Sequence, residues 1–232
     1  MPYAENNKTN GVKVKHIFRN KQHSSDPVWH VQATLLTAIL LQFLLPEDFL
    51  AGSKHTITVV SLLALLILSL TTPRKAVYQS VWRRLNVTVL AVSIGLTNLY
   101  SLFKVLHALL NGGITNGRQL ILAGINIYLT NIVVFGLVYW EMDGGGPGQR
   151  RAQDTSSRDF LFPQENMHGG SGRAWNPTFI DYLYVSSTNA TAFSPTDTMP
   201  LSRRSKMLML AQSIVSLLAI ALIAGRAVNI LY

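Results

Sequence analysis

Five long stretches of apolar residues, almost free of Asp, Glu, Lys and Arg, dominate the sequence. An α-helix rises about 1.5 Å per residue, and the hydrocarbon core of a bilayer is about 30 Å thick. Apolar stretches approaching this length predict membrane-spanning helices. We therefore expect an all-α membrane protein with about five transmembrane helices, at residues 31–45, 56–72, 86–110, 119–140 and 205–231.

Composition supports a membrane location and provides no sign of an enzyme. Only 13% of the 232 residues are charged, about half the share of roughly 25% that is typical of soluble domains. The chain has no Cys, which excludes disulfides, thiol catalysis and thiolate metal sites. We find no motif typical of a zinc protease, a serine hydrolase or a nucleotide-binding loop. We therefore predict no catalytic residue, no metal ligand and no cofactor.

The basic residues predict the orientation of the chain. The formal net charge is +9, and nearly all of it lies between the apolar stretches, which favours membrane topology over nucleic-acid binding. If the N-terminus is cytoplasmic, all but four of the 20 lysines and arginines lie on the cytoplasmic side or in loops facing it; the four are Lys54, Lys104, Arg118 and Arg226. We expect a multi-pass protein of the cell (inner) membrane with a cytoplasmic N-terminus.

The segment between the fourth and fifth spans is too polar for an ordinary span. Asn176-Pro177 is a helix-start signal, and Asp181 then lies near the positive end of the helix dipole. The helix is expected over residues 178–190 and should fail before Pro195. We interpret it as a re-entrant helix, which is tolerated only where protein or water surrounds the irregular backbone. The alternative is an amphipathic helix on the membrane surface.

Residues 181–200, DYLYVSSTNATAFSPTDTMP, resemble the pore-helix and filter region of potassium channels. That family often shows the pattern D-A-L-Y-F-S-F-V-T-L-T-T-V-G-Y-G-D-x-x-P. Seven positions match without gaps: Asp181, Leu183, Tyr184, Ser186, Thr191, Asp197 and Pro200. The resemblance implies an outer helix, a re-entrant helix, a filter-like segment and an inner helix, assembled as a homotetramer that takes a monovalent cation. The segment is also similar to the terminal pattern of an uncharacterised bacterial multi-span membrane protein family.

The filter itself departs from the potassium-channel pattern. The family's two filter glycines align with Ser194 and Thr196, and its filter tyrosine aligns with Pro195. Because those glycines permit the backbone geometry that aims the carbonyl oxygens, potassium selectivity is not implied. The family's filter also faces outside, whereas the charge pattern puts this segment inside. The side from which the segment enters the membrane therefore stays open.

The resemblance defines two sets of candidate site residues. Hydroxyl and carbonyl oxygens of the filter-like segment could replace part of an ion's hydration shell, with the Asp197 charge at one mouth. Equally, Thr191 and Ser194 could satisfy the helix end while Asp197 caps a turn. The filter-like residues are Thr191, Ala192, Phe193, Ser194, Pro195, Thr196 and Asp197, and the pore-helix supports are Asp181, Tyr184 and Ser186.

Polar residues within other spans give further candidates. Two polar stripes could line an aqueous pathway or could join neighbouring helices by packing and hydrogen bonds. They comprise Thr97, Ser101, Lys104 and His107 in the third span, and Gln212 and Ser216 in the fifth. At the end of the fourth span, Tyr139 and Trp140 suit an interfacial aromatic belt. Glu141 and Asp143 follow, and we expect solvated acids there rather than an acid–base or cation site.

These observations give a domain plan and three function classes. The plan comprises a basic tail at 1–28, a three-helix membrane region at 29–111 and a pore module at 119–232. The module contains the loop 142–176, the re-entrant helix and filter-like segment at 177–200, and the inner helix at 205–231. We predict an oligomeric ion channel or channel-like protein. The alternatives are a non-conducting scaffold or accessory subunit, and a small transporter whose site lies where helices break near the midplane.

Overall fold

The computed structural model describes residues 29–50, 52–53, 59–63, 65–66, 81–111, 117–147, 149–150, 158–167, 175–191 and 198–230. The basic tail at 1–28 and most of the expected second span lie outside the described residues, although residues 59–63 and 65–66 of that span are helical.

Helices dominate the described residues, which confirms the all-α prediction. The long elements are α1 (Trp29–Leu44), α3 (Val81–Leu110), α4 (Gly117–Met142), α6 (Phe179–Thr191) and α7 (Arg203–Ile230). The short elements are η1 (Glu47–Phe49), η2 (Asp143–Gly145), α5 (Pro163–Met167), and the strands β1 (Phe160–Leu161) and β2 (Met199–Pro200). The two strands pair antiparallel, with Phe160 opposite Pro200.

Three of the described helices are long and apolar enough to cross a membrane: Trp82–Leu110, Gly117–Gly145 and Arg203–Arg226. They correspond to the third, fourth and fifth expected spans. The helix of the first expected span, α1, has 16 residues and covers about 24 Å, which is less than the hydrocarbon core. The described residues therefore support a membrane protein with three candidate spans, and the count of about five stays a prediction.

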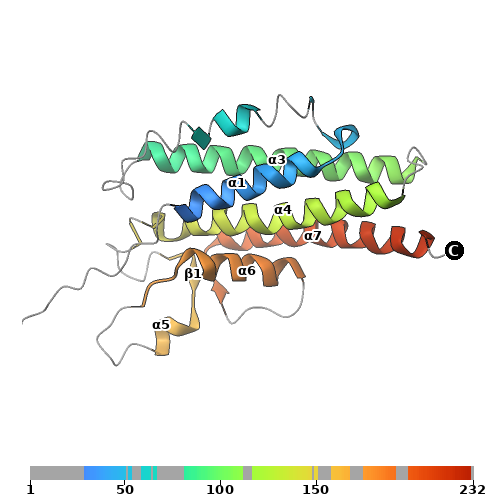
Figure 1. Cartoon of the computed structure of the whole chain (residues 1–232). Helices are drawn as coiled ribbons and strands as arrows, with labels where there is room; N and C mark the ends of the chain where they lie inside the picture. Colours follow the sequence, from blue (N-terminus) through green and yellow to red (C-terminus); the bar gives the residue numbers. More distant parts are fainter. Residues whose placement is uncertain are drawn as a thin grey trace, which may run out of the picture.

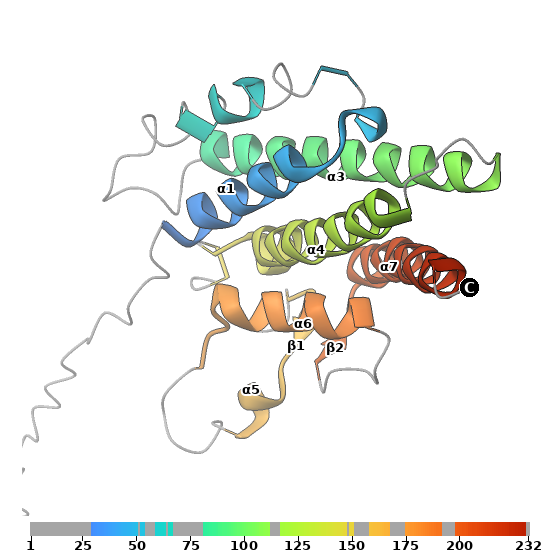
Figure 2. The same ribbon diagram turned by 45° about the vertical axis from the view of Figure 1, so that its right-hand side comes forward.

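Helix α4 occupies the middle of the bundle (Figures 1 and 2). Helices α1 and α3 lie on one side of it, and α6 and α7 lie on the other, while α4 runs opposite to α3 and α7. One end of the bundle holds the starts of α3, α6 and α7 and the end of α4. We call it the basic end, because it holds Arg83, Arg84, Arg150, Arg158, Arg203, Arg204 and Lys206.

Gly136 of α4 lets helix α6 pack closely against α4. A Cβ added at Gly136 would lie 3.2 Å from the Leu183 Cα, on the backbone of α6. Small residues at such crossings let helix backbones come close, which strengthens van der Waals packing within a membrane. The glycine therefore sets the distance at which α6 packs against α4.

The outer faces of the long helices are apolar. Leu96 and Phe103 on α3 and Leu217 on α7 are each more than 60% exposed. Contiguous exposed apolar surface is rare on soluble monomers, whereas lipid-facing helix surfaces consist of such residues. The apolar outer faces thus support the same conclusion as the lengths of the three helices, namely that they are candidate membrane spans.

Candidate functional site

Helix α6, the helix expected between the fourth and fifth spans, begins at a side-chain cap. The Asp181 Oδ2 accepts hydrogen bonds from the Thr178 backbone N–H at 2.6 Å and from the Thr178 hydroxyl at 2.8 Å. The carboxylate therefore satisfies an amide group at the helix start, where negative charge is also favoured by the dipole. The helix ends at Thr191, one residue beyond its expected end.

The chain reaches α6 from the basic end of the bundle and comes back to that end after it. Helix α6 has 13 residues, about 20 Å, and packs alongside α4 and α7. Strand β1 precedes it and pairs with β2, which follows it. The Leu201 N–H also donates to the Asp159 carbonyl at 2.8 Å. Residues before and after α6 are thus held together at one end of the bundle.

A buried glutamine joins the three helices of this region. Gln212 on α7 is fully buried. Its Oε1 accepts from the Tyr139 hydroxyl at 2.6 Å and from the Asn189 amide at 2.9 Å. Its Nε2 donates to the Ser186 carbonyl at 2.9 Å and to the Ser186 hydroxyl oxygen at 2.7 Å. We call these four residues the Gln212 cluster; it draws one side chain from α4, two from α6 and one from α7.

Further hydrogen bonds extend the Gln212 cluster along α4 and α7. The Asn131 amide donates to the Gln212 carbonyl at 3.1 Å and to the Ser216 hydroxyl oxygen at 2.8 Å. The Ser186 hydroxyl donates to the Ile132 carbonyl at 2.7 Å. Gln212, Ser216 and Ser186 are each 0% exposed. Their hydrogen bonds are satisfied within one chain, as buried polar groups require.

The polar stripe of α3 makes separate contacts. Gln42 of α1 donates to the Thr97 hydroxyl oxygen, and the Ser101 hydroxyl donates to the Thr97 carbonyl at 2.9 Å. Lys104 is half-buried, while His107 is exposed and lies beside Asn111. Among the described residues, no hydrogen bond joins this stripe to Gln212 or Ser216. The two sets of candidate pathway residues are therefore not joined by hydrogen bonds in the described part of the chain.

The filter-like segment falls mostly outside the described residues. Thr191 is the last residue of α6, and its hydroxyl donates to the Thr188 carbonyl at 3.0 Å. Residues 192–197, with Ser194, Pro195, Thr196 and Asp197, lie outside the described part. Of the pore-helix supports, Asp181 caps α6, Ser186 belongs to the Gln212 cluster, and Tyr184 is 64% exposed.

The acids at the end of α4 are buried, so the expectation that they are solvated is wrong. Glu141 is 3% exposed and Asp143 is 0% exposed. The Arg83 Nη2 lies 3.0 Å from the Glu141 Oε1, and the Arg150 Nη1 lies 3.4 Å from the Asp143 Oδ2. Each arginine balances a carboxylate that would otherwise be costly to bury.

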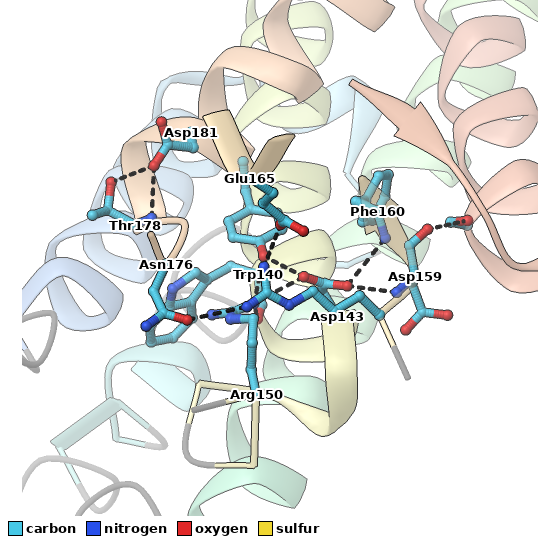
Figure 3. Close-up of polar contacts among 12 residues, drawn as sticks. Trp140, Asp143, Arg150, Asp159, Phe160, Glu165, Asn176, Thr178 and Asp181 are labelled. Atoms are coloured by element: carbon cyan, nitrogen blue, oxygen red, sulfur yellow. Dashed lines mark hydrogen bonds and ion pairs between the residues drawn. The ribbon is translucent and has the colours of Figure 1, made fainter. Parts of the chain in front are cut away.

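Asp143 holds the basic end together (Figure 3). Its Oδ1 accepts from the Asp159 and Phe160 N–H groups at 2.6 and 3.1 Å, and its Oδ2 accepts from the Tyr182 hydroxyl. Arg150 donates to the same Tyr182 oxygen at 2.6 Å. The carboxylate therefore fixes β1 and α6 relative to the end of α4.

The turn after α4 explains how Asp143 and Arg150 meet. Gly144, Gly145 and Gly146 all have positive φ, at 56°, 80° and 92°, a backbone conformation that costs glycine little. The Gly146 N–H donates to the Asp143 carbonyl and the Arg150 N–H donates to the Gly146 carbonyl, each at 2.9 Å. The glycine run therefore folds the chain back so that Arg150 lies beside Asp143.

A second ion pair reinforces the loop near α6. Arg158 contacts Glu165 of α5 and donates to the Asn176 Oδ1 at 3.1 Å. Burial raises the pKa of the Glu165 carboxyl above its ordinary value, although the neighbouring Arg158 acts to lower it. The pair therefore links the loop to the residue that begins the α6 start signal.

Tyr139 and Trp140 also differ from expectation. Both were expected in an interfacial aromatic belt, but they are 0% and 1% exposed. Trp140 packs edge-on against Phe179 of α6, with ring centroids 6.0 Å apart. The sequence analysis did not identify Asn131 and Asn189 as members of this hydrogen-bonded region. The sequence indicates them only by their polarity within an apolar or helical stretch.

The described residues offer no group of three or more His, Cys, Asp or Glu that could hold a metal ion. What they offer is a hydrogen-bonded polar core within a helical bundle and a set of buried ion pairs at its basic end. No family model, curated protein or solved structure matches the chain.

Proposed function

We propose that this protein is an oligomeric, channel-like membrane protein whose ion pathway is formed by α4, α6 and α7 of several copies. The observation that supports this is the packing of α6 against both α4 and α7, with the chain before and after it paired at one end. In this proposal α4 is the outer helix, α6 is the re-entrant helix and α7 is the inner helix.

The filter-like segment would supply the ion contacts. In the sequence, residues 192–197 follow α6 and precede β2. Hydroxyl and carbonyl oxygens from Thr191 to Thr196 would replace part of the hydration shell of a monovalent cation, and Asp197 would add charge at one mouth. A homotetramer follows by analogy with potassium channels.

The arrangement also bears on the side from which an ion would meet this segment. By the positive-inside rule, the basic end is cytoplasmic in the cell membrane, so α6 would enter from the cytoplasm, which is opposite to potassium channels. Attaching a tag to each end of the chain and testing protease access in sealed vesicles would establish the orientation.

A non-conducting scaffold or accessory subunit is the second candidate. The observation that favours it is the full burial of Gln212 and Ser216, whose hydrogen bonds are satisfied within one chain. In a scaffold, such bonds serve only to fix the packing of neighbouring helices.

Ion flux into liposomes that contain the purified protein separates the two candidates. We expect cation flux, and we expect Asp197→Asn to lower conductance and cation preference. The matched control is Asp48→Asn, because Asp48 is exposed and lies in η1, which contacts α3. Flux that is unchanged by Asp197→Asn would refute the role of Asp197. An absence of flux for common ions, or a strict monomer in nanodiscs, would favour the scaffold.

A further inference from the structure

Helices α3 and α7 both pack against α4, and a cavity of about 250 Å³ lies between the three helices near the basic end. Its walls are mostly apolar and include Val87 and Ala91 of α3, Leu137 of α4 and Leu208 of α7. Thr88 belongs to the same lining and is exposed, so the cavity opens on the outer surface of the bundle. If the three helices cross the bilayer, lipid reaches that opening. A hydrocarbon chain would gain van der Waals contacts with these walls that an empty cavity lacks.

Arg84 gives the cavity a positive charge that is not engaged in an ion pair. Glu141 also belongs to the lining, but its side chain is 4% exposed and its carboxylate already contacts Arg83 at 3.0 Å. Asp143, the next carboxylate along the chain, contacts Arg150. In the described part of the chain, the Arg84 guanidinium makes no hydrogen bond and no ion pair. Its charge is therefore available to an anion that enters the cavity.

Arg84 lies where a lipid headgroup is expected. A Cβ added at Gly146 would be 3.5 Å from the Arg84 Nε, so this side chain lies beside the glycine turn after α4. The turn begins at the end of the candidate span Gly117–Gly145. Trp82, two residues before Arg84, is 76% exposed, and exposed tryptophans are typical of the membrane–water interface. The apolar walls of the cavity extend from this level toward the middle of the spans.

Helix α7 adds a second positive charge on the same side. Arg204 precedes Leu208 by four residues, so the two side chains lie on one face of α7, with Arg204 closer to the basic end. Arg204 is exposed. Because Leu208 lines the cavity, Arg204 lies one turn beyond the cavity on the headgroup side. Positive charge from both α3 and α7 thus adjoins one apolar cavity.

We propose that this cavity holds one acyl chain of an anionic phospholipid of the phosphatidylglycerol class. The Arg84 guanidinium donates to the lipid phosphate, which a planar guanidinium suits well, and Arg204 adds to the attraction. An ammonium or choline headgroup would instead bring a positive charge beside these two arginines, whereas the glycerol headgroup is neutral. The proposal goes beyond the channel proposal and holds whether or not the protein conducts ions.

A comparison of lipids tests the proposal. The full chain, purified in a mild detergent, is mixed with phosphatidylglycerol or phosphatidylcholine that carry the same acyl chains, and bound lipid is counted by native mass spectrometry. One basic residue near an anionic surface contributes about fivefold to binding, so two should favour phosphatidylglycerol by at least about tenfold. Equal binding of the two lipids would overturn the proposal.

A headgroup without acyl chains tests the role of the apolar walls. Glycerophosphoglycerol carries the same phosphate as phosphatidylglycerol, and we expect it not to displace the bound lipid at the same concentration. Displacement by this compound would show that the walls hold no chain, and the proposal of a phospholipid site would fail.

A matched pair of arginine variants tests the charge. Arg84→Gln removes the guanidinium from the cavity lining, and we expect the preference for phosphatidylglycerol to fall by about fivefold. The control is Arg203→Gln, which removes the same charge from the same end of the bundle; Arg203 is exposed and does not belong to the lining. Equal effects of the two variants would show that the general charge of the basic end, rather than this cavity, selects the lipid.

A second pair tests the cavity without changing any charge. Thr88→Phe adds bulk to the lining, and we expect it to weaken the binding of phosphatidylglycerol. The control is Val89→Phe, because Val89 is 56% exposed and does not belong to the lining. Binding that is unchanged in Thr88→Phe would place the lipid elsewhere and overturn the proposal. This pair decides even if Arg84→Gln fails to fold.

Discussion

Replacing Gln212 with leucine tests whether the Gln212 cluster holds α4, α6 and α7 together. The side chain of Gln212 makes four hydrogen bonds, and all four are lost in Gln212→Leu. Two of the partner groups keep another hydrogen bond: the Asn189 amide still donates to the Met209 carbonyl, and the Ser186 hydroxyl still donates to the Ile132 carbonyl of α4. The Tyr139 hydroxyl is left buried without its acceptor.

The expected loss in the free energy of unfolding follows from these hydrogen bonds. A buried polar group without a partner costs about 1–3 kcal/mol, and hydrogen bonds between membrane helices contribute about 0.6 kcal/mol each on average. We therefore expect Gln212→Leu to lower the free energy of unfolding by about 2–4 kcal/mol. Gln119→Leu is the matched control, because Gln119 is exposed at the start of α4, and it should change stability by less than about 0.5 kcal/mol.

A second substitution tests the cause of the loss. Tyr139→Phe removes the hydroxyl that Gln212→Leu leaves without an acceptor, so the double variant should recover about 1–2 kcal/mol, since removing both partners of a hydrogen bond costs less than removing one. Stability is measured by SDS titration of the protein in mild-detergent micelles. If Tyr139→Phe has the same effect in both backgrounds, the two side chains are not coupled and the reasoning fails.

Two other predictions concern the ion-pair end of α4 and its close contact with α6. Asp143→Asn leaves a buried arginine without its counter-charge, so we expect the free energy of unfolding to fall by about 3–5 kcal/mol in the same titration. The control Asp48→Asn, at an exposed site, should be nearly neutral. Equal effects of the two variants would refute the role of the buried charge. Gly136→Ala places a Cβ against the backbone of α6 and should destabilise the bundle. The control is Gly225→Ala, whose added Cβ meets nothing within 4 Å, so this variant should be neutral or stabilising. A neutral Gly136→Ala would show that α6 moves freely.

Hydropathy alone predicted the long helices well, because lipid-facing surfaces must be apolar all along their length. The expected span at 119–140 corresponds to α4, Gly117–Met142, and the span at 205–231 to α7, Arg203–Ile230. The start of α6 was predicted from Asn176-Pro177, which is a local signal. The expected span at 86–110 leaves out the first turns of α3, Val81–Leu110. Hydropathy ends a span at an arginine, whereas the structure buries Arg83 beside Glu141.

The candidate site was predicted less well, because its contacts join residues far apart in the chain. Gln212 and Tyr139 are separated by 73 residues and Asp143 and Tyr182 by 39. A carboxylate after a span is commonly solvated, and only the position of Arg150 relative to the glycine turn reveals that Asp143 is not. The filter-like residues 192–197 lie outside the described part, so their role stays a prediction.

The central position of α4 has a consequence for biosynthesis. Asn131 and Tyr139 bond to Gln212, which the ribosome adds 81 and 73 residues later. Until α7 emerges, these α4 side chains would face either lipid or the insertion machinery. We therefore expect nascent chains that end before α7 to be retained by membrane insertases or degraded, and the last helix to release the protein into the bilayer as a completed bundle.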